Sequence, residues 1–211
     1  MTMVRRTYDH RYFRSTIHRT FPNAQRNRQR IRLILRHHQQ GRLLEIGPGT
    51  GEFLQLAART FDVEGIEISA DAVKAVQPGL RGAIRVGNIE HAPLPRHHYQ
   101  IVTAFNVLEH LHNPQAAVAK VRQALATGGC FVGSMPHNAG TVGRLYTQIS
   151  NFFDRTHCST LPPEQWRAVF QQAGFTEIVF FGEIPFSPHF CLYVNGQRWS
   201  TIAANLMFVC H

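Results

Sequence analysis

Short apolar runs alternate with longer segments of helical periodicity along the chain. The apolar runs have the length and composition of buried strands. They predict seven strands near residues 42–46, 62–66, 83–86, 99–104, 129–134, 176–182 and 204–209. The periodic segments predict six helices near residues 23–39, 51–59, 70–76, 115–125, 141–152 and 163–172. Strands that alternate with helices favour an α/β fold, in which helices cover both faces of a parallel sheet.

Length and composition are those of a single globular domain. The chain has 211 residues, of which 44% are hydrophobic, so it can bury one substantial core. It contains no apolar run of membrane-spanning length, and no apolar segment follows Arg5 and Arg6 as a secretory signal would require. The four cysteines lack CxxC spacing, which indicates reduced thiols and favours a cytoplasmic protein. None of the 13 histidines forms an HExxH or paired Cys/His pattern, so we predict no metal site.

The most informative segment is residues 43–53, Leu-Leu-Glu-Ile-Gly-Pro-Gly-Thr-Gly-Glu-Phe. A predicted strand is followed by three alternating glycines, which let the backbone turn sharply and approach a ligand closely. The dinucleotide-binding pattern would place its third glycine where this chain has Glu52, and an acid there repels a pyrophosphate. Glu45, at the end of the strand, suits a cationic group. These features favour a positively charged nucleoside without phosphates over an ordinary glycine-rich turn.

A second acid ends the next predicted strand. Glu67 lies 16 residues beyond the last of the three glycines and is followed by Ser69, a helix N-cap candidate. Ligands of open α/β sheets bind at the carboxyl ends of the strands. Glu67 is therefore positioned to accept hydrogen bonds from both hydroxyls of a ribose, although a solvated acid at a strand end is the alternative.

Further motifs follow in order and carry a family resemblance. They are residues 87–95, 105–114, 125–136, 154–157, 161–166 and 173–175. Together with the glycine segment and Glu67, they resemble the class I S-adenosylmethionine-dependent methyltransferases, in the broad group with small-molecule, quinone and glycan-type acceptors. The resemblance implies a Rossmann-like, seven-stranded, mostly parallel sheet with the last strand antiparallel.

The resemblance also implies a cofactor, S-adenosylmethionine, which would leave as S-adenosylhomocysteine. Where the family usually has an aspartate that contacts the adenine amino group, this chain has Asn88, whose carbonyl can accept the same bond without charge assistance. Glu90 is the alternative acid. The expected cofactor-binding residues are Glu45, Gly47, Pro48, Gly49, Gly51, Glu67, Ile68, Asn88, Ile89, Glu90, Phe105 and Asn106.

An oxygen or nitrogen acceptor can require a base to remove its proton, and histidine suits this role near neutral pH. His110 follows the fourth predicted strand, His137 follows the fifth, and His157 lies before the sixth. Asp154 stands three residues before His157, so on a helical turn the acid could orient the imidazole; a purely structural cap is the alternative.

The first 40 residues form a basic arm, with ten arginines and a single acid, Asp9. This arm carries a net charge of +9, as much as the whole chain. A solvated helical lid, an anionic small substrate and a nucleic acid are the alternatives that this charge leaves open. We expect the arm (residues 1–40) to cap a cofactor-binding domain (41–211), with Tyr8, Tyr12 and Phe13 near the entrance.

The segment 136–163 is expected to shape the acceptor site. The favoured function is an enzyme that methylates an oxygen or nitrogen of a small-molecule or glycan-like acceptor. The alternatives are an RNA-directed methyltransferase that uses the basic arm, and a cofactor-binding module without catalysis.

Overall fold

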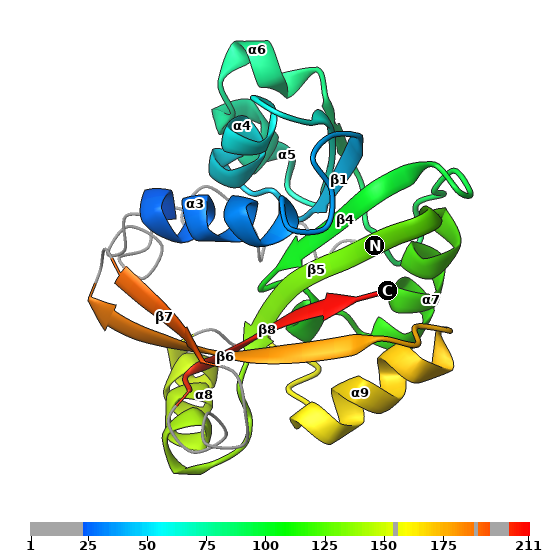
Figure 1. Ribbon diagram of the computed structural model, residues 1–211. Helices are drawn as coiled ribbons and strands as arrows, with labels where there is room; N and C mark the ends of the chain where they lie inside the picture. The colour runs from blue at the N-terminus through cyan, green and yellow to red at the C-terminus, as the bar shows by residue number, and fades with distance from the viewer. Residues whose placement is uncertain (1–22, 154–155, 188–189, 195–202) are drawn as a thin grey trace.

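One eight-stranded sheet organises the computed structural model, which describes residues 23–153, 156–187, 190–194 and 203–211 (Figure 1). Its strands are β1 (Arg42–Ile46), β2 (Asp62–Glu67), β3 (Ile84–Val86), β4 (Tyr99–Phe105), β5 (Leu125–Pro136), β6 (Ile178–Ser187), β7 (Phe190–Val194) and β8 (Asn205–Cys210). They lie in the order β3-β2-β1-β4-β5-β8-β6-β7. The first five strands are parallel, and β8 is antiparallel to both of its neighbours, β5 and β6.

Helices cover both faces of this sheet. They are α3 (Asn23–Ile34), α4 (Glu52–Ala57), α5 (Ala70–Ala75), α6 (Pro78–Arg81), α7 (Pro114–Ala124), α8 (Thr141–Phe153) and α9 (Pro163–Gln172), with a 3₁₀ turn, η2 (Leu108–His110). On one face, α7 and α9 pack an aromatic core in which Trp166 and Phe170 meet Phe131 and Phe208 of the sheet. On the other face, α3 to α6 bury a mainly aliphatic core.

The Rossmann-like fold expected from the sequence is confirmed, and all seven predicted strands and six predicted helices are present. The differences are local. The sheet gains an eighth strand, β7, which pairs antiparallel with β6 at the edge. The sequence did not reveal this hairpin because Pro185 lies inside β6, where proline normally ends a strand. The first described helix ends at Ile34 and not at residue 39, and α6 and η2 were not predicted.

No helix in the described ranges is long and apolar enough to cross a membrane.

Candidate functional site

The glycine loop after β1 adopts backbone conformations that side chains disfavour. Gly47, Gly49 and Gly51 have φ angles of 68°, 56° and 82°. A Cβ atom on Gly47 would lie 2.6 Å from a methyl carbon of Val107, so only glycine lets the loop pass this close to the exit of β4. Gly51 is the N-cap of α4. The loop therefore presents bare backbone at the carboxyl edge of the sheet, as the sequence suggested.

Glu67 joins this loop to the next one. At the end of β2, its Oε2 accepts a hydrogen bond from the N–H of Gly49 (2.9 Å), and its Oε1 accepts one from the N–H of Ser69 (2.8 Å). Burial raises the pKa of Glu67 above its ordinary value, and these backbone donors oppose the rise. Each carboxylate oxygen has a second lone pair for a ligand hydroxyl. The position of Glu67 at the strand end is as expected, and its contact with a ribose stays a prediction.

Glu45 is the second buried acid of the site. Its side chain lies beside the glycine loop at the end of β1, with only 3% of the residue exposed. Burial raises the pKa of Glu45 to about 8, and the nearby positive charge of Arg30 opposes this rise. Within the described part of the chain, its Oε2 has no hydrogen-bond partner. A buried carboxylate oxygen without a donor is costly, so this atom marks the place where a cationic ligand group fits.

The loop after β3 is held by side chains from α7. Asn88 Oδ1 accepts a hydrogen bond from the N–H of Glu90 (2.9 Å), and Glu90 Oε1 accepts one from the N–H of Asn113 (2.7 Å). The ammonium of Lys120 donates to three carbonyl oxygens of this loop at 2.9–3.0 Å, and Ile89 is buried in the core. Asn88 and Glu90 thus shape the loop, and an adenine contact by either one stays a prediction.

Arg30, on α3, reaches the ends of β4 and β5. Its guanidinium lies 4.0 Å from the ring centre of Phe105 and 3.5 Å from Ser134 Oγ. The hydroxyl of Ser134 in turn donates to Oδ1 of Asn106 (3.0 Å), a residue with a positive φ of 55°. Because Arg30 also acts on the pKa of Glu45, it links three strand ends. Sequence reasoning missed Arg30, because no pattern distinguishes it among the ten arginines of the arm.

A second arginine of α3, Arg26, anchors the helix to strand β6. Arg26 Nε lies 3.0 Å from Oε1 of Glu183, whose side chain is fully buried. Glu183 is aligned with Asn205, which is aligned with Pro136 at the end of β5, so this pair also lies at the carboxyl edge. Helix α3, which contacts α4 and β7, therefore begins at the edge where the ligand-binding loops lie (Figure 1).

Two of the predicted histidines come together with an acid that was not predicted. Potential ligand atoms of Glu109, His110 and His157 all lie within 4.8 Å of one another, and the two imidazole rings are 4.7 Å apart. Nδ1 of His110 is 2.8 Å from the hydroxyl of Thr156. The backbone carbonyl of Glu109 accepts hydrogen bonds from two N–H groups, those of residues 158 and 159 (2.8 and 2.9 Å). We call these three residues the Glu-His-His cluster.

Of the other predicted catalytic residues, the described His137 does not belong to the cluster. His157 follows α8 in irregular chain, and Asp154 lies outside the described residues, so their pairing stays a prediction. His137 is fully buried, with Nδ1 3.0 Å from the carbonyl oxygen of Ala203 at the approach to β8. Burial lowers the pKa of His137. This environment fastens two chain segments together and separates His137 from the Glu-His-His cluster.

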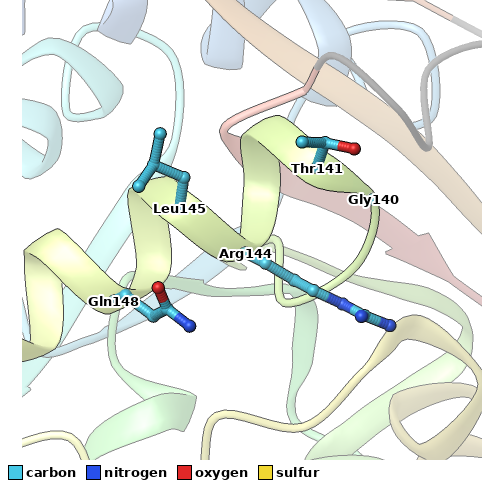
Figure 2. Close-up of a pocket in the computed structure, with 5 residues that line it drawn as sticks. All are labelled: Gly140, Thr141, Arg144, Leu145 and Gln148. Atoms are coloured by element: carbon cyan, nitrogen blue, oxygen red, sulfur yellow. The ribbon is translucent and has the colours of Figure 1, made fainter.

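A hollow of about 430 Å³ opens at the start of α8 (Figure 2). The described residues that line it come from one stretch of chain: Gly140, Thr141, Arg144, Leu145 and Gln148. It includes no residue of the glycine loop or of the Glu-His-His cluster. The hollow is a feature of the segment 136–163 and is not the site defined by the strand ends.

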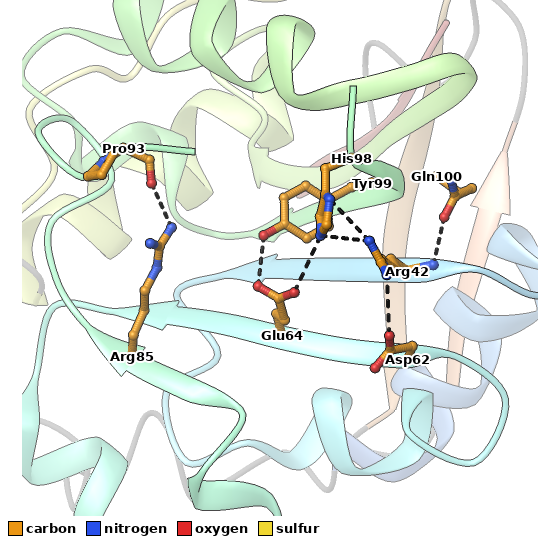
Figure 3. Close-up of polar contacts among 8 residues, drawn as sticks. All are labelled: Arg42, Asp62, Glu64, Arg85, Pro93, His98, Tyr99 and Gln100. Atoms are coloured by element: carbon orange, nitrogen blue, oxygen red, sulfur yellow. Dashed lines mark hydrogen bonds and ion pairs between the residues drawn. The ribbon is translucent and has the colours of Figure 1, made fainter. Parts of the chain in front are cut away.

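The opposite, amino edge of the sheet carries a polar clasp (Figure 3). The hydroxyl of Tyr99 donates to Glu64 Oε2 (2.8 Å), and His98 lies 3.8 Å from the other oxygen of Glu64. Arg42 contacts the ring of His98 (3.1 Å) and Asp62 (3.7 Å). Burial, followed by the bond to Glu64, raises the pKa of Tyr99 above its usual value. The clasp joins the beginnings of β1, β2 and β4, far from the ligand loops.

A family model described as a methyltransferase domain matches residues 6–179. The chain belongs to this family. It is a class I S-adenosylmethionine-dependent methyltransferase domain, and the family's cofactor is the one expected from the glycine loop and the two acids. Glu45, with its unpartnered oxygen, and Glu67 fit the cationic and hydroxyl groups of this cofactor.

Curated relatives agree with this assignment. A probable S-adenosylmethionine-dependent methyltransferase of Mycolicibacterium smegmatis is 30% identical over 146 residues, which are 67% of this chain and 54% of that protein. A ubiquinone biosynthesis O-methyltransferase of Psychrobacter arcticus is 29% identical over 153 residues, 64% of this chain and 59% of that protein. The chain thus spans just over half the length of these relatives.

Solved structures show the same fold. A methyltransferase of Thermotoga maritima, described as a possible histamine N-methyltransferase, superposes with a TM-score of 0.71 at 18% identity and covers 87% of this chain and 88% of that one. A methyltransferase of Archaeoglobus fulgidus gives 0.68 at 18% identity, covering 87% of this chain and 91% of that one.

Proposed function

We propose that the protein transfers a methyl group from S-adenosylmethionine to an oxygen or nitrogen of a small-molecule or glycan-like acceptor. The observation that carries this proposal is the arrangement of one edge of the sheet. Two buried acids flank a bare glycine loop there, and His110, which follows the adjacent strand β4, lies next to His157. The Psychrobacter arcticus relative, named for an O-methylation, supports a hydroxyl acceptor.

The cofactor supplies a methyl group that its sulfonium sulfur has already activated. The protein therefore has to hold and orient the reactants and exclude water. Glu45 would hold the cationic amino-acid end of the cofactor through its unpartnered oxygen, and Glu67 would accept the ribose hydroxyls. The loop at residues 88–90, braced by Lys120, would border the adenine.

The Glu-His-His cluster would contact the acceptor, because it follows directly from the carboxyl end of β4. His137 is assigned a structural role, since its buried ring bonds to Ala203. The arm (residues 1–40) would cap the site; α3 is its described part, and residues 1–22, with Tyr8, Tyr12 and Phe13, lie outside the described residues. The segment 136–163 would border the acceptor.

Two of the five arginines in the described part of the arm favour a small acceptor over RNA. Arg26 and Arg30 are turned toward Glu183 and the strand ends, so they contribute little to an outward basic surface. The other three, Arg28, Arg32 and Arg36, are exposed, and the RNA alternative rests on them.

Binding and turnover separate this proposal from its alternatives. We expect isothermal titration calorimetry to detect S-adenosylhomocysteine binding, and labelled S-adenosylmethionine to transfer its methyl to some member of an acceptor panel of phenols, sugars and amines. The variant Glu67→Ala should bind the cofactor about 10–150-fold more weakly, because it loses charged hydrogen bonds. Glu64→Gln is the matched control, since this acid lies on the same strand but in the amino-edge clasp.

Two outcomes would contradict the proposal. Cofactor binding without any product across the panel would identify a non-catalytic binding module. A melting temperature raised by NAD but not by adenosyl ligands would identify a dinucleotide site.

A further inference from the structure

We propose that Glu109, His110 and His157 bind a divalent transition-metal ion at the acceptor side of the site. The sequence predicts no metal site, because these residues belong to two segments nearly 50 positions apart and show no ligand spacing. The fold brings the segments together, and all three potential ligand atoms lie within 4.8 Å of one another.

The donor set is appropriate for such an ion. One carboxylate and two imidazoles are the ligands of several catalytic zinc sites and of facial-triad iron sites. Zinc–nitrogen bonds of about 2.0–2.1 Å place tetrahedral ligand atoms about 3.3–3.5 Å apart. The widest pair of the cluster therefore has to close by about 1.5 Å or less, which small rotations of the two half-buried imidazoles can provide.

Neighbouring groups already orient the ligands. Thr156 lies 2.8 Å from Nδ1 of His110, which directs the other ring nitrogen, Nε2, toward an ion. The two N–H groups that bond to the carbonyl of Glu109 hold the segment of His157 against η2. A metal-ligating histidine usually has such a partner on its second nitrogen, and this partner fixes the ring and its tautomer.

Burial points to the same interpretation. Glu109 is 1% exposed, and a divalent cation would strongly stabilise the charged form of such a carboxylate. The two imidazoles are half-buried, so the cluster is closed toward the protein interior and accessible on the other side. Three protein ligands leave at least one coordination position open.

This open position indicates the class of acceptor, an inference that rests on the proposed function. An oxygen of the acceptor, such as a phenol or sugar hydroxyl, would occupy it. The ion would lower the pKa of that hydroxyl, whose proton would pass to solvent water. The two imidazoles would then act as ligands of the ion and not as the base.

Cobalt(II) provides a direct test, because its visible absorption reports on coordination by nitrogen and oxygen. The full chain, treated with a chelator and dialysed, is titrated with Co²⁺ without any cofactor, and Zn²⁺ is then added as a competitor. We expect one Co²⁺ per chain in a site of low coordination number, displaced by Zn²⁺. His157→Ala and Glu109→Gln should each weaken binding at least 100-fold; Glu109→Gln keeps the shape of a buried side chain and so guards against misfolding.

His211→Ala is the matched control. His211 and His37 form another histidine pair, with ring nitrogens 3.1 Å apart, and this variant should leave Co²⁺ binding unchanged. The proposal is overturned if no stoichiometric site is found, or if the two cluster variants bind Co²⁺ as tightly as the parent protein. It is also overturned if chelator-treated enzyme retains full turnover, which would leave the imidazoles as direct bases. Because no cofactor is present in the titration, failure to bind S-adenosylmethionine would defeat the proposed function but not this site.

Discussion

At the scale of single residues, the protonation state of Glu45 affects stability and cofactor binding in opposite directions. The protonated form favours the folded protein, whereas the charged form suits the cationic end of the cofactor. Its folded-state pKa is about 8, against an ordinary value of 4.5, so the folded protein retains a proton that the unfolded chain loses. The retained proton of Glu45 therefore stabilises the folded protein; this stabilisation is complete below pH 4.5 and is lost as the pH rises to 8. A bound cation would offset the loss.

The variant Glu45→Gln tests this directly. Between pH 5 and 8, the free energy of unfolding of the parent protein should fall more steeply than that of the variant, by up to about 1.4 kcal/mol per pH unit. Urea denaturation at several pH values measures the difference. The variant should also bind S-adenosylhomocysteine more weakly. Glu52→Gln, which changes an exposed acid at the start of α4, is the matched control. Unfolding free energies of Glu45→Gln that run parallel to those of the parent across this pH range would rule out the pKa assignment of Glu45.

Residue-level prediction from sequence worked where a residue's role follows from its place on a strand. Glu45 and Glu67 end neighbouring strands, so their meeting at one edge was foreseeable. Arg30 and Glu109 were not foreseeable, because their environments depend on contacts with distant segments. His110 and His137 follow the fourth and fifth predicted strands and His157 precedes the sixth, as expected, but sequence could not show that His110 meets His157 while His137 is buried.

At the scale of elements, an ion pair with a buried carboxylate helps to hold α3 to the sheet. Arg26→Met would remove this ion pair with Glu183, which should cost about 3–5 kcal/mol of stability. The double variant Arg26→Met/Glu183→Gln should recover most of this loss, since it removes the buried charge as well. Urea denaturation of both singles and the double completes the cycle. Additive effects, without a coupling energy, would show that the pair does not hold the helix.

Sequence pattern predicted the elements well and their extent less well. The 3.6-residue periodicity identified α3, but the turn after Ile34 ended it five residues early. Likewise, β6 continues through Pro185 because its pairing with β8 ends at Glu183, so in the described residues Pro185 pairs on one side only, with β7, as in an edge strand that tolerates proline. Pairing between distant strands is decided by the whole sheet, which local pattern does not encode.

At the scale of the whole molecule, the two edges of the sheet differ in function: the carboxyl edge serves ligand binding, and the amino edge serves stability. The carboxyl edge holds Glu45, Glu67 and the Glu-His-His cluster, whereas the amino edge holds the clasp around Glu64 and Tyr99 (Figure 3). Ligands of open α/β sheets bind at the carboxyl edge. We therefore expect residues of the amino edge to affect stability and not cofactor binding.

Tyr99→Phe tests this division. The substitution keeps the ring, which is 1% exposed, and removes only the hydroxyl that donates to Glu64. Because Glu64 is half-exposed and water can replace the lost donor, the cost should be about 1 kcal/mol of stability, measured by urea denaturation. The dissociation constant of S-adenosylhomocysteine should stay within twofold of the parent value. Glu67→Gln, at the other end of β2, should show the reverse pattern, with a large loss of affinity. If Tyr99→Phe instead weakened cofactor binding as much as Glu67→Gln, the two edges would be energetically coupled through the strands between them, and the separation of tasks would be wrong.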